Sequence, residues 1–320
     1  MSELELLRSL PTGLEEPRDT ARARARGRLL RHIRRAPSVR RRRLLVAAVV
    51  LAAAGVIAAF ADFGSHGSDR AAAATLLRRI ATVARVQPAP KPVTAGHFHY
   101  TRSLVAYMSG GSGWTTLSPG VREIWLGPTG GRLHERWGKP RFLSAADRQN
   151  WIAAGRPQVN PPEDSGDLPP SRPLGLPVDP YALYAKLHDR AVGRGNSTDA
   201  EMFTLVGDSL RETDASPALR ASLYEVAARI PGVELVGPAN DRIGRHGVAV
   251  AYVDAKIHER HVLIFDPKTA ALLGEEYVQL DGNPYGYPAG TVTGYATYVA
   301  SAVVDRLGAR PWLASRPGRR

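Results

Sequence analysis

Two histidines, His97 and His99, stand on either side of Phe98, and imidazole nitrogens are common ligands of zinc. Because alternate residues of a β-strand point to the same face, the two side chains would lie next to each other on a strand. A third ligand would have to come from His258 or His261, and no glutamate stands where metal-assisted hydrolysis needs a general base. His97 and His99 are therefore weak metal candidates, and the simpler interpretation is that they are polar residues of a strand face.

A second pattern, Gly-Asp-Ser-Leu at 207–210, matches the nucleophile block of a family of serine esterases. In such enzymes the serine follows a parallel strand, and an Asp-x-x-His block lies far downstream. Here the apolar residues around Ser209 recur with helical spacing, and Asp254 and His258 are one residue too far apart. The sequence therefore places Ser209 inside a helix, and we predict no enzymatic activity, no catalytic residues, no metal and no cofactor.

Composition excludes further chemistry and shows where the charge lies. The chain has no cysteine, which rules out disulfides, thiol nucleophiles and cysteine-ligated zinc. Its formal net charge is +13, and residues 1–43 contribute much of it, with 13 arginines against 5 acidic residues. Neither helix-turn-helix spacing nor aromatic residues interleaved with the arginines accompany this charge, so no direct contact with nucleic acid is expected.

The arginines are followed by an uncharged apolar run over 44–61, whose length of about 18 residues is close to the roughly 20 that cross a bilayer core. We predict a single transmembrane helix there. Under the positive-inside rule, residues 1–43 are cytoplasmic and everything after Ala61 lies outside, so we expect a cell-membrane protein with the lipid bilayer as a partner. The residues that orient the helix are Arg40, Arg41, Arg42 and Arg43.

A cleaved export signal is the alternative for this segment. Ala59, Phe60 and Ala61 form an A-x-A cleavage pattern, and an arginine pair before an apolar run is typical of a twin-arginine leader. A patterned extension of about forty residues ahead of the arginines is unusual for a leader, which favours the transmembrane helix.

The cytoplasmic segment carries two short sets of apolar residues. Leu6 and Leu10 form a cluster near the start, and Leu29 and Ile33 belong to a narrow stripe with i, i+4 spacing on an arginine-rich helix. Three interpretations stay open: a basic face held near anionic lipid headgroups, a docking helix for a cytosolic protein, and DNA binding, which has the least support. If a partner docks, these four apolar residues are expected to bind it.

The region beyond the apolar run is predicted to be α+β, with a curved antiparallel sheet packed with helices. Alternating apolar residues indicate strands in two groups, and helical periodicity separates the groups. The expected divisions are a linker and amphipathic helix over 62–96, an α+β domain over 97–310 and a disordered basic tail over 311–320. Within the domain we expect a Pro-rich irregular loop over 156–179, a helical block over 180–230 and strands over 247–304.

Three stretches beyond the apolar run carry a family resemblance: IPGVELVG at 230–237, DRIGRHGVAVAY at 241–252 and LIFDPKTAALLGEE at 263–276. With the arginine cluster and the single span, they resemble an actinobacterial family of single-pass membrane proteins of uncharacterised function, whose layout is similar to that of anti-sigma regulators. The resemblance implies no catalytic residues. It implies a membrane regulator, with a transcription factor such as a sigma factor as its cytosolic partner.

A fainter resemblance concerns the outer domain. The order of a helix, then GHFHYTR at 96–102, then paired strands is similar to that of lipoprotein-carrier and sigma-regulator half-barrels. In those proteins a curved antiparallel sheet wraps helices and encloses an apolar groove, which implies an envelope lipid or lipoprotein as ligand. The Pro-rich loop and the helical block between the two groups of strands depart from that pattern.

The sequence thus leads to three hypotheses. The first is a single-pass membrane regulator with an outer sensor domain and a cytoplasmic segment that docks a partner such as a sigma factor. The second is a membrane-anchored binding or carrier module for an apolar ligand, without signalling. The third, an exported hydrolase, needs His97, His99 or Ser209 to act in catalysis.

Overall fold

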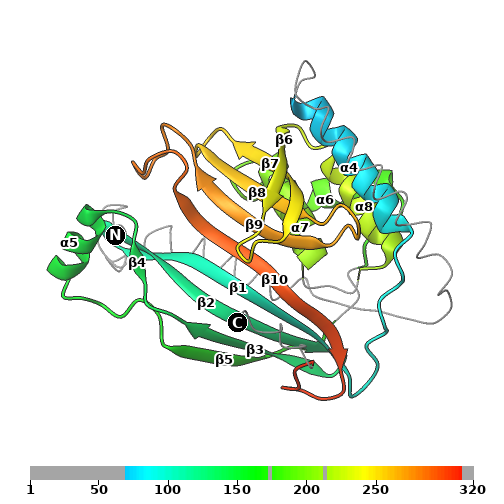
Figure 1. Ribbon diagram of the computed structural model, residues 1–320, viewed down its shortest axis with the longest axis horizontal. Coiled ribbons are helices and arrows are strands. Elements are labelled where there is room, and N and C mark those ends of the chain that lie inside the picture. Colours follow the sequence, from blue (N-terminus) through cyan, green and yellow to red (C-terminus); the bar gives the residue numbers. More distant parts are fainter. Residues whose placement is uncertain (1–68, 172–174, 212–214, 312–320) are drawn as a thin grey trace, which may run out of the picture.

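The computed structural model describes residues 69–171, 175–211 and 215–311, which form an α+β fold with a 10-stranded antiparallel sheet and five helices (Figure 1). In these ranges no helix is both long and apolar enough to cross a bilayer. Several predicted features lie outside the described residues: the apolar run over 44–61, the partner-binding candidates Leu6, Leu10, Leu29 and Ile33, and the orienting residues Arg40, Arg41, Arg42 and Arg43.

The sheet is built from two groups of strands. The N-terminal strands are β1 (Phe98–Gly111), β2 (Trp114–Gly127), β3 (Gly130–Trp137), β4 (Arg141–Phe142) and β5 (Glu163–Leu168). The C-terminal strands are β6 (Val233–Asn240), β7 (His246–Asp254), β8 (Glu259–Phe265), β9 (Leu272–Gln279) and β10 (Val292–Val304). Their order across the sheet is β5-β3-β2-β1-β10-β9-β8-β7-β6, and β4 pairs with β2. The strands that come first and last in the sequence, β1 and β10, are therefore neighbours in the sheet, and their pairing joins the two groups.

Four of the five described helices lie with the C-terminal strands, namely α4 (Asp69–Arg85), α6 (Pro180–Ala191), α7 (Thr198–Arg211) and α8 (Pro217–Ala227), whereas α5 (Ala145–Ala153) lies beside β2 and β4. Two of them begin with a strong local signal. The Asp179 carboxylate accepts hydrogen bonds from first-turn N–H groups of α6, and Ser216 does the same for α8. In both helices a proline follows the cap, where its missing N–H costs nothing.

The main hydrophobic core lies between these four helices and one face of the C-terminal strands. Alternation along β7 directs Val248 and Val250 toward the helices, and Ala249 and Ala251 toward the opposite face. Figure 1 shows α4 at the upper right, where it packs against α8 and β6. The face opposite the helices holds smaller apolar clusters, one of them around Trp125.

The two edge strands of the sheet differ in composition and regularity. β5 has the sequence EDSGDL and pairs with β3 along its length. β6 is interrupted by a register shift between Leu235 and Gly237, and it contains Pro238, which has no N–H to donate.

The stretch over 156–179 differs from its prediction as an irregular loop, because it contains β5. The strand has no apolar alternation, so its sequence gives no strand signal. Its pairing comes from the β3 backbone and from polar contacts such as the ion pair of Arg132 with Asp167. By contrast, the stretch over 180–230 holds the three helices α6, α7 and α8, and the α+β class is confirmed.

A buried ionic contact ties α7 to the sheet. Arg211, the last residue of α7, places Nη2 2.8 Å from Glu275 Oε2 on β9 and 2.9 Å from Asp208 Oδ1. Glu275 also accepts a 2.9 Å hydrogen bond from the Tyr298 hydroxyl and lies 3.3 Å from His261 Nε2. Burial alone would raise the pKa of the Glu275 carboxyl, but the Arg211 charge and these hydrogen bonds hold it at about 2.

Replacing Arg211 by methionine is therefore expected to lower the free energy of unfolding by about 3–5 kcal/mol, because two carboxylates remain buried without their cation. Urea denaturation of the full chain, followed by tryptophan fluorescence, measures the loss. Arg132→Met is the matched control: its partner Asp167 is exposed, so that change should cost at most about 1 kcal/mol. Equal losses of unfolding free energy in the two variants would contradict the prediction that the buried Arg211 contact stabilises the fold more than the exposed Arg132 ion pair.

Candidate functional site

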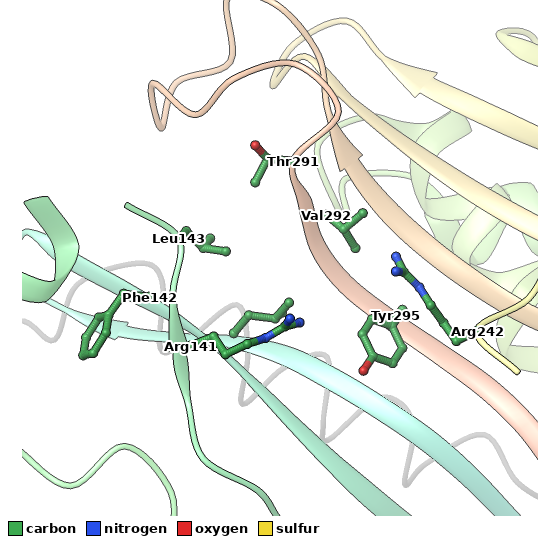
Figure 2. A pocket seen from close by; sticks show the side chains of 8 residues that line it. Arg141, Phe142, Leu143, Arg242, Thr291, Val292 and Tyr295 are labelled. Atoms are coloured by element: carbon green, nitrogen blue, oxygen red, sulfur yellow. The ribbon is translucent and has the colours of Figure 1, made fainter. Parts of the chain in front are cut away.

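A pocket of about 270 Å³ lies on the sheet face opposite the helices, between the β4 segment and β10 (Figure 2). The strand register identifies this face. Glu275 points toward Arg211 of α7, so its neighbour Glu276, and Tyr295 opposite Glu276, point away from the helices. The pocket is lined by Leu117, Arg141, Phe142, Leu143, Arg242, Thr291, Val292 and Tyr295.

The lining combines apolar surface with two cations. Aliphatic and aromatic side chains from β2, the β4 segment and β10 supply the apolar part of the wall. More than half of the lining surface is polar, and Arg141 and Arg242 are its charged groups. Figure 2 shows Arg141 extending from the β4 segment toward Tyr295, with Arg242 on the other side of the space. Small-molecule sites usually combine apolar surface with a few directed polar groups, and this lining holds both kinds of group.

Arg242 is held by the turn between β6 and β7. The Asp241 carboxylate accepts hydrogen bonds from the backbone N–H groups of Ile243 and Arg245, at 3.0 and 2.9 Å, and a 2.5 Å contact from Arg245 Nε. Arg245 also donates to the backbone carbonyls of β9 and β10, at 3.1 and 2.8 Å. These hydrogen bonds hold the turn against β9 and β10. In this position the Arg242 guanidinium lies 4.8 Å from the centre of the Tyr295 ring.

The opposite wall is held by the N-terminus of α5. Ser144 caps this helix: its hydroxyl accepts a 3.0 Å hydrogen bond from the Asp147 N–H and donates a 2.6 Å bond to the Asp147 carboxylate. The same carboxylate accepts a 2.6 Å bond from the Thr115 N–H on β2. These contacts fix the short β4 segment, which leads directly into α5, against β2.

Asp147 also connects the two groups of strands. The Tyr287 hydroxyl, in the loop between β9 and β10, lies 3.1 and 3.2 Å from the two Asp147 carboxylate oxygens. Asn283 shapes this loop, because its amide donates to the carbonyls of Leu280 and Tyr287 and accepts from two N–H groups of the loop. We name the Tyr287–Asp147 contact the clasp, since it joins the two sides of the pocket.

The histidines singled out from the sequence do not come together in a metal site. The His97 ring lies 3.0 Å from the Thr94 hydroxyl, just before β1, and the His99 ring lies 2.9 Å from the Ser301 hydroxyl on β10. His258 occupies a turn, where its ring lies 2.7 Å from a backbone carbonyl, and His261 contacts Glu275. Among the described residues, no group of three His, Cys, Asp or Glu side chains could hold a metal ion.

Ser209 lies inside α7, as the helical spacing predicts. The Ser209 hydroxyl donates a 2.8 Å hydrogen bond to the Leu205 carbonyl, four residues earlier, and the side chain is buried. This is the ordinary contact of a serine in a helix interior, not the exposed turn on which an esterase presents its nucleophile.

One carboxyl outside the pocket has a pKa raised into the neutral range. Burial is the largest cause of the raised pKa of Glu259, about 7, and the nearby Asp254 charge adds to it. Gln279 donates a 2.6 Å hydrogen bond to the Glu259 carboxyl, and the Thr293 hydroxyl lies 3.3 Å away. Glu259 lies on β8, Gln279 on β9 and Thr293 on β10, so the Glu259 carboxyl is held by hydrogen bonds from the two following strands.

The segment after β10 folds back over the same face as the pocket, at the other end of β2. The indole N–H of Trp125 donates a 2.6 Å hydrogen bond to the Ala309 carbonyl. Arg310 donates to both oxygens of the Glu123 carboxylate, at 2.6 and 2.7 Å, and the Tyr100 hydroxyl donates to Glu123 at 2.6 Å. We name residues 305–310 the strap.

Sequence reasoning misses the pocket residues because their positions run from 117 to 295 along the chain. Arg141 and Arg242 are two arginines among many in a basic sequence, and no motif marks them. The available signal is indirect: Ser144 and Asp147 have the spacing of a helix cap, which would have indicated α5. The contact between Arg242 and Tyr295 depends on the folded sheet.

The strap should contribute stability that depends on pH. Burial by itself raises the pKa of the Glu123 carboxyl, but hydrogen bonds from Arg310 and Tyr100 hold it at about 2. Because this value lies below the ordinary 4.5, the contribution is present above about pH 4.5 and is lost as the pH falls toward 2.

Arg310→Gln is expected to lower the free energy of unfolding at pH 7 by about 1–3 kcal/mol, and the difference from the original chain should shrink toward pH 3. Urea denaturation at both pH values tests this. Arg306→Gln removes an arginine from the same strap, where no side-chain contact to Glu123 is made, and should change little. A constant difference at pH 7 and pH 3 would contradict the role assigned to Glu123.

The clasp should order both walls of the pocket. Tyr287→Phe removes the hydroxyl but keeps the ring, so we expect a loss of about 0.5–1.5 kcal/mol in unfolding free energy. Hydrogen exchange should become faster in α5 and in the loop over 280–291. Tyr181→Phe on α6 is the control, because that side chain is 73% exposed. Unchanged exchange in both segments would show that the clasp does not hold the pocket.

Comparisons with known proteins give no family assignment. No protein-family model matches the chain, and no curated protein matches it. A chain of the Pseudomonas aeruginosa MucA/MucB complex is similar with a TM-score of 0.25 and 14% identity, over 75% of this chain and 58% of that chain. A DUF1329 family protein from Desulfovibrio piger has a TM-score of 0.21 and 12% identity, over 74% of this chain and 93% of its own. Both structural likenesses are distant.

Proposed function

We propose that this chain is a single-pass membrane protein of regulatory type. Its outer α+β domain binds a ligand in the pocket beside β10, and its N-terminal segment docks a cytosolic partner such as a sigma factor. The observation that carries the proposal is the pocket, in which apolar side chains stand beside two arginines on the helix-free face of the sheet.

The pocket supports binding in preference to catalysis. None of its lining residues is a carboxylate, a histidine or a cysteine, so the lining offers no general base and no activated nucleophile. Guanidinium groups remain protonated in proteins and act by holding anions. We therefore propose that the outer domain is not an enzyme.

A continuous set of contacts runs from the pocket to α4, the described helix that is nearest in sequence to the proposed membrane segment. Arg242 stands in the turn between β6 and β7, β6 packs against α4, and α4 begins at Asp69, a few residues after the apolar run over 44–61. A ligand that shifts Arg242 would act on this turn, and through β6 on α4. Such a chain of packed elements supports a relay, although coupling requires two states that the ligand binds unequally.

The second candidate function is a membrane-anchored binding module without signalling. It shares the pocket and the outer domain, and it differs only in the role of residues 1–43. In that case the basic segment orients the chain in the membrane and interacts with anionic lipid, and no cytosolic protein binds it.

The discriminating experiment is crosslinking in native membranes with a tag at the C-terminus. Leu29→Asp with Ile33→Asp places two charges in the apolar stripe, whereas Ala23→Asp with Gly27→Asp adds the same charges to the opposite side of the predicted helix. We expect the original chain and the control to retain a transcription factor and the stripe variant to lose it.

Other outcomes reject the proposal in different ways. Equal partner recovery from all three chains shows that the stripe is not the docking surface. Recovery of envelope components alone, with a full-length bait, leaves the binding module. A bait that begins near Asp62 shows that the apolar run is a cleaved export signal.

A further inference from the structure

We propose that the pocket takes a small apolar acid, with one carboxylate bound between Arg141 and Arg242 and a short acyl or aryl body against the apolar wall. This inference rests on the proposed function, because it names the ligand class of the same pocket. It follows from the charge, the size and the fixed geometry of the lining.

The charge balance of the pocket favours a monoanion. Arg242 Nε lies 2.7 Å from Glu276 Oε1, so the first of the two cations is balanced by a neighbouring carboxylate. The Arg141 side chain makes no hydrogen bond or ion pair within the described part of the chain, and it extends into the pocket (Figure 2). Two cations and one anion leave one positive charge, which a single carboxylate neutralises and a doubly charged phosphate exceeds.

The donors suit a carboxylate in geometry as well as in charge. A guanidinium presents parallel N–H groups that match the two oxygens of a carboxylate. Arg242 forms an ion pair with Glu276 through Nε, and its guanidinium lies over the Tyr295 ring at the edge of the pocket. Arg141 comes from the β4 segment on the other side, so an acid bound between them would contact both groups of strands.

The size and lining of the pocket define the rest of the ligand. A volume of about 270 Å³ lies just below the range of ligand pockets, which span roughly 300–1,000 Å³. Leu117, Leu143 and Val292 supply aliphatic surface, and Phe142 and Tyr295 supply rings. A short acyl or aryl body fits this space, whereas a lipid with two acyl chains needs considerably more volume.

The backbone segments that carry the two arginines are held in place, which lowers the entropic cost of binding. Arg245 and Asp241 hold the turn that carries Arg242, and Ser144 and Asp147 hold the segment that carries Arg141. The clasp joins the second of these supports to the loop between β9 and β10, which leads into Thr291 and Val292 of the pocket. Neither arginine therefore depends on a long mobile loop for its position.

Photolabelling of the full chain in phosphatidylcholine nanodiscs tests the inference. The probe is trifluoromethyl-diazirinyl benzoic acid, and the matched neutral probe is the benzyl alcohol with the same diazirine ring. We expect the acid to label peptides that contain Phe142 or Tyr295, and the alcohol to label them at least about tenfold less, since a hydrogen-bonded charge is worth about 1.5–3 kcal/mol.

Arginine variants and competitors complete the test. Arg141→Gln and Arg242→Gln should each lower pocket labelling by about tenfold or more. Arg132→Gln, on β3 opposite Trp125 and outside the pocket lining, should leave it unchanged. Circular dichroism melts of all three variants confirm that each chain remains folded. Unlabelled octanoate should displace the probe more effectively than octyl phosphate.

Each result that differs from these expectations rejects a specific part of the inference. Equal labelling by acid and alcohol rejects the acid but leaves a pocket for apolar ligands, as the proposed function requires. Stronger displacement by octyl phosphate rejects the monoanion. Absence of specific labelling in the pocket rejects the ligand assignment, while the crosslinking experiment with the Leu29 and Ile33 variants decides the docking role separately.

Discussion

The pairing of β1 with β10 is the contact on which the rest of the structure depends. Its register extends from Phe98 opposite Val304 to Tyr107 opposite Gly294, so it connects positions about two hundred residues apart in sequence. Without it the N-terminal strands and the C-terminal strands would form separate sheets. The pocket, the clasp and the strap all combine residues from the two groups, so each of them exists only after this ladder has formed. Closing so large a loop is entropically costly, and the ladder offsets that cost with backbone hydrogen bonds along most of two long strands.

Two buried carboxylates, on opposite faces of the sheet, are each neutralised by an arginine from a neighbouring element. Glu275 faces the helices and is compensated by Arg211 from α7, and Glu123 faces away from them and is compensated by Arg310 from the strap. In each case an arginine at the end of an element neutralises a carboxylate in the middle of a strand. A buried charge offsets its desolvation cost only when its partner lies at the right distance and angle. These pairs therefore help to fix the positions of α7 and the strap on the sheet. Arg141 of the pocket lacks this arrangement, since its side chain has no acidic partner among the described residues.

The fold class was predictable from local patterns, whereas the pocket was not. Helices α6 and α8 begin at a cap followed by proline, and β7 alternates between the core and the opposite face, so adjacent residues carry the necessary information. β5 has no such alternation, because backbone pairing with β3 and not side-chain burial makes it a strand. Arg242 reaches Tyr295 only because Asp241 and Arg245 fasten a turn over strands that are distant in sequence. Local periodicity contains no information about such contacts between distant segments.

The two edges of the sheet have consequences for how copies of this protein behave when crowded together. An exposed edge is a template for intermolecular β-pairing and aggregation. At one edge, β5 presents Glu163, Asp164 and Asp167, so a second copy approaching edge to edge would bring carboxylates against carboxylates. At the other edge, the bulge before Gly237 and the missing N–H of Pro238 interrupt the row of donors that an added strand needs. Electrostatic repulsion at one end and broken backbone geometry at the other leave a large open sheet with no edge on which a fibril could grow.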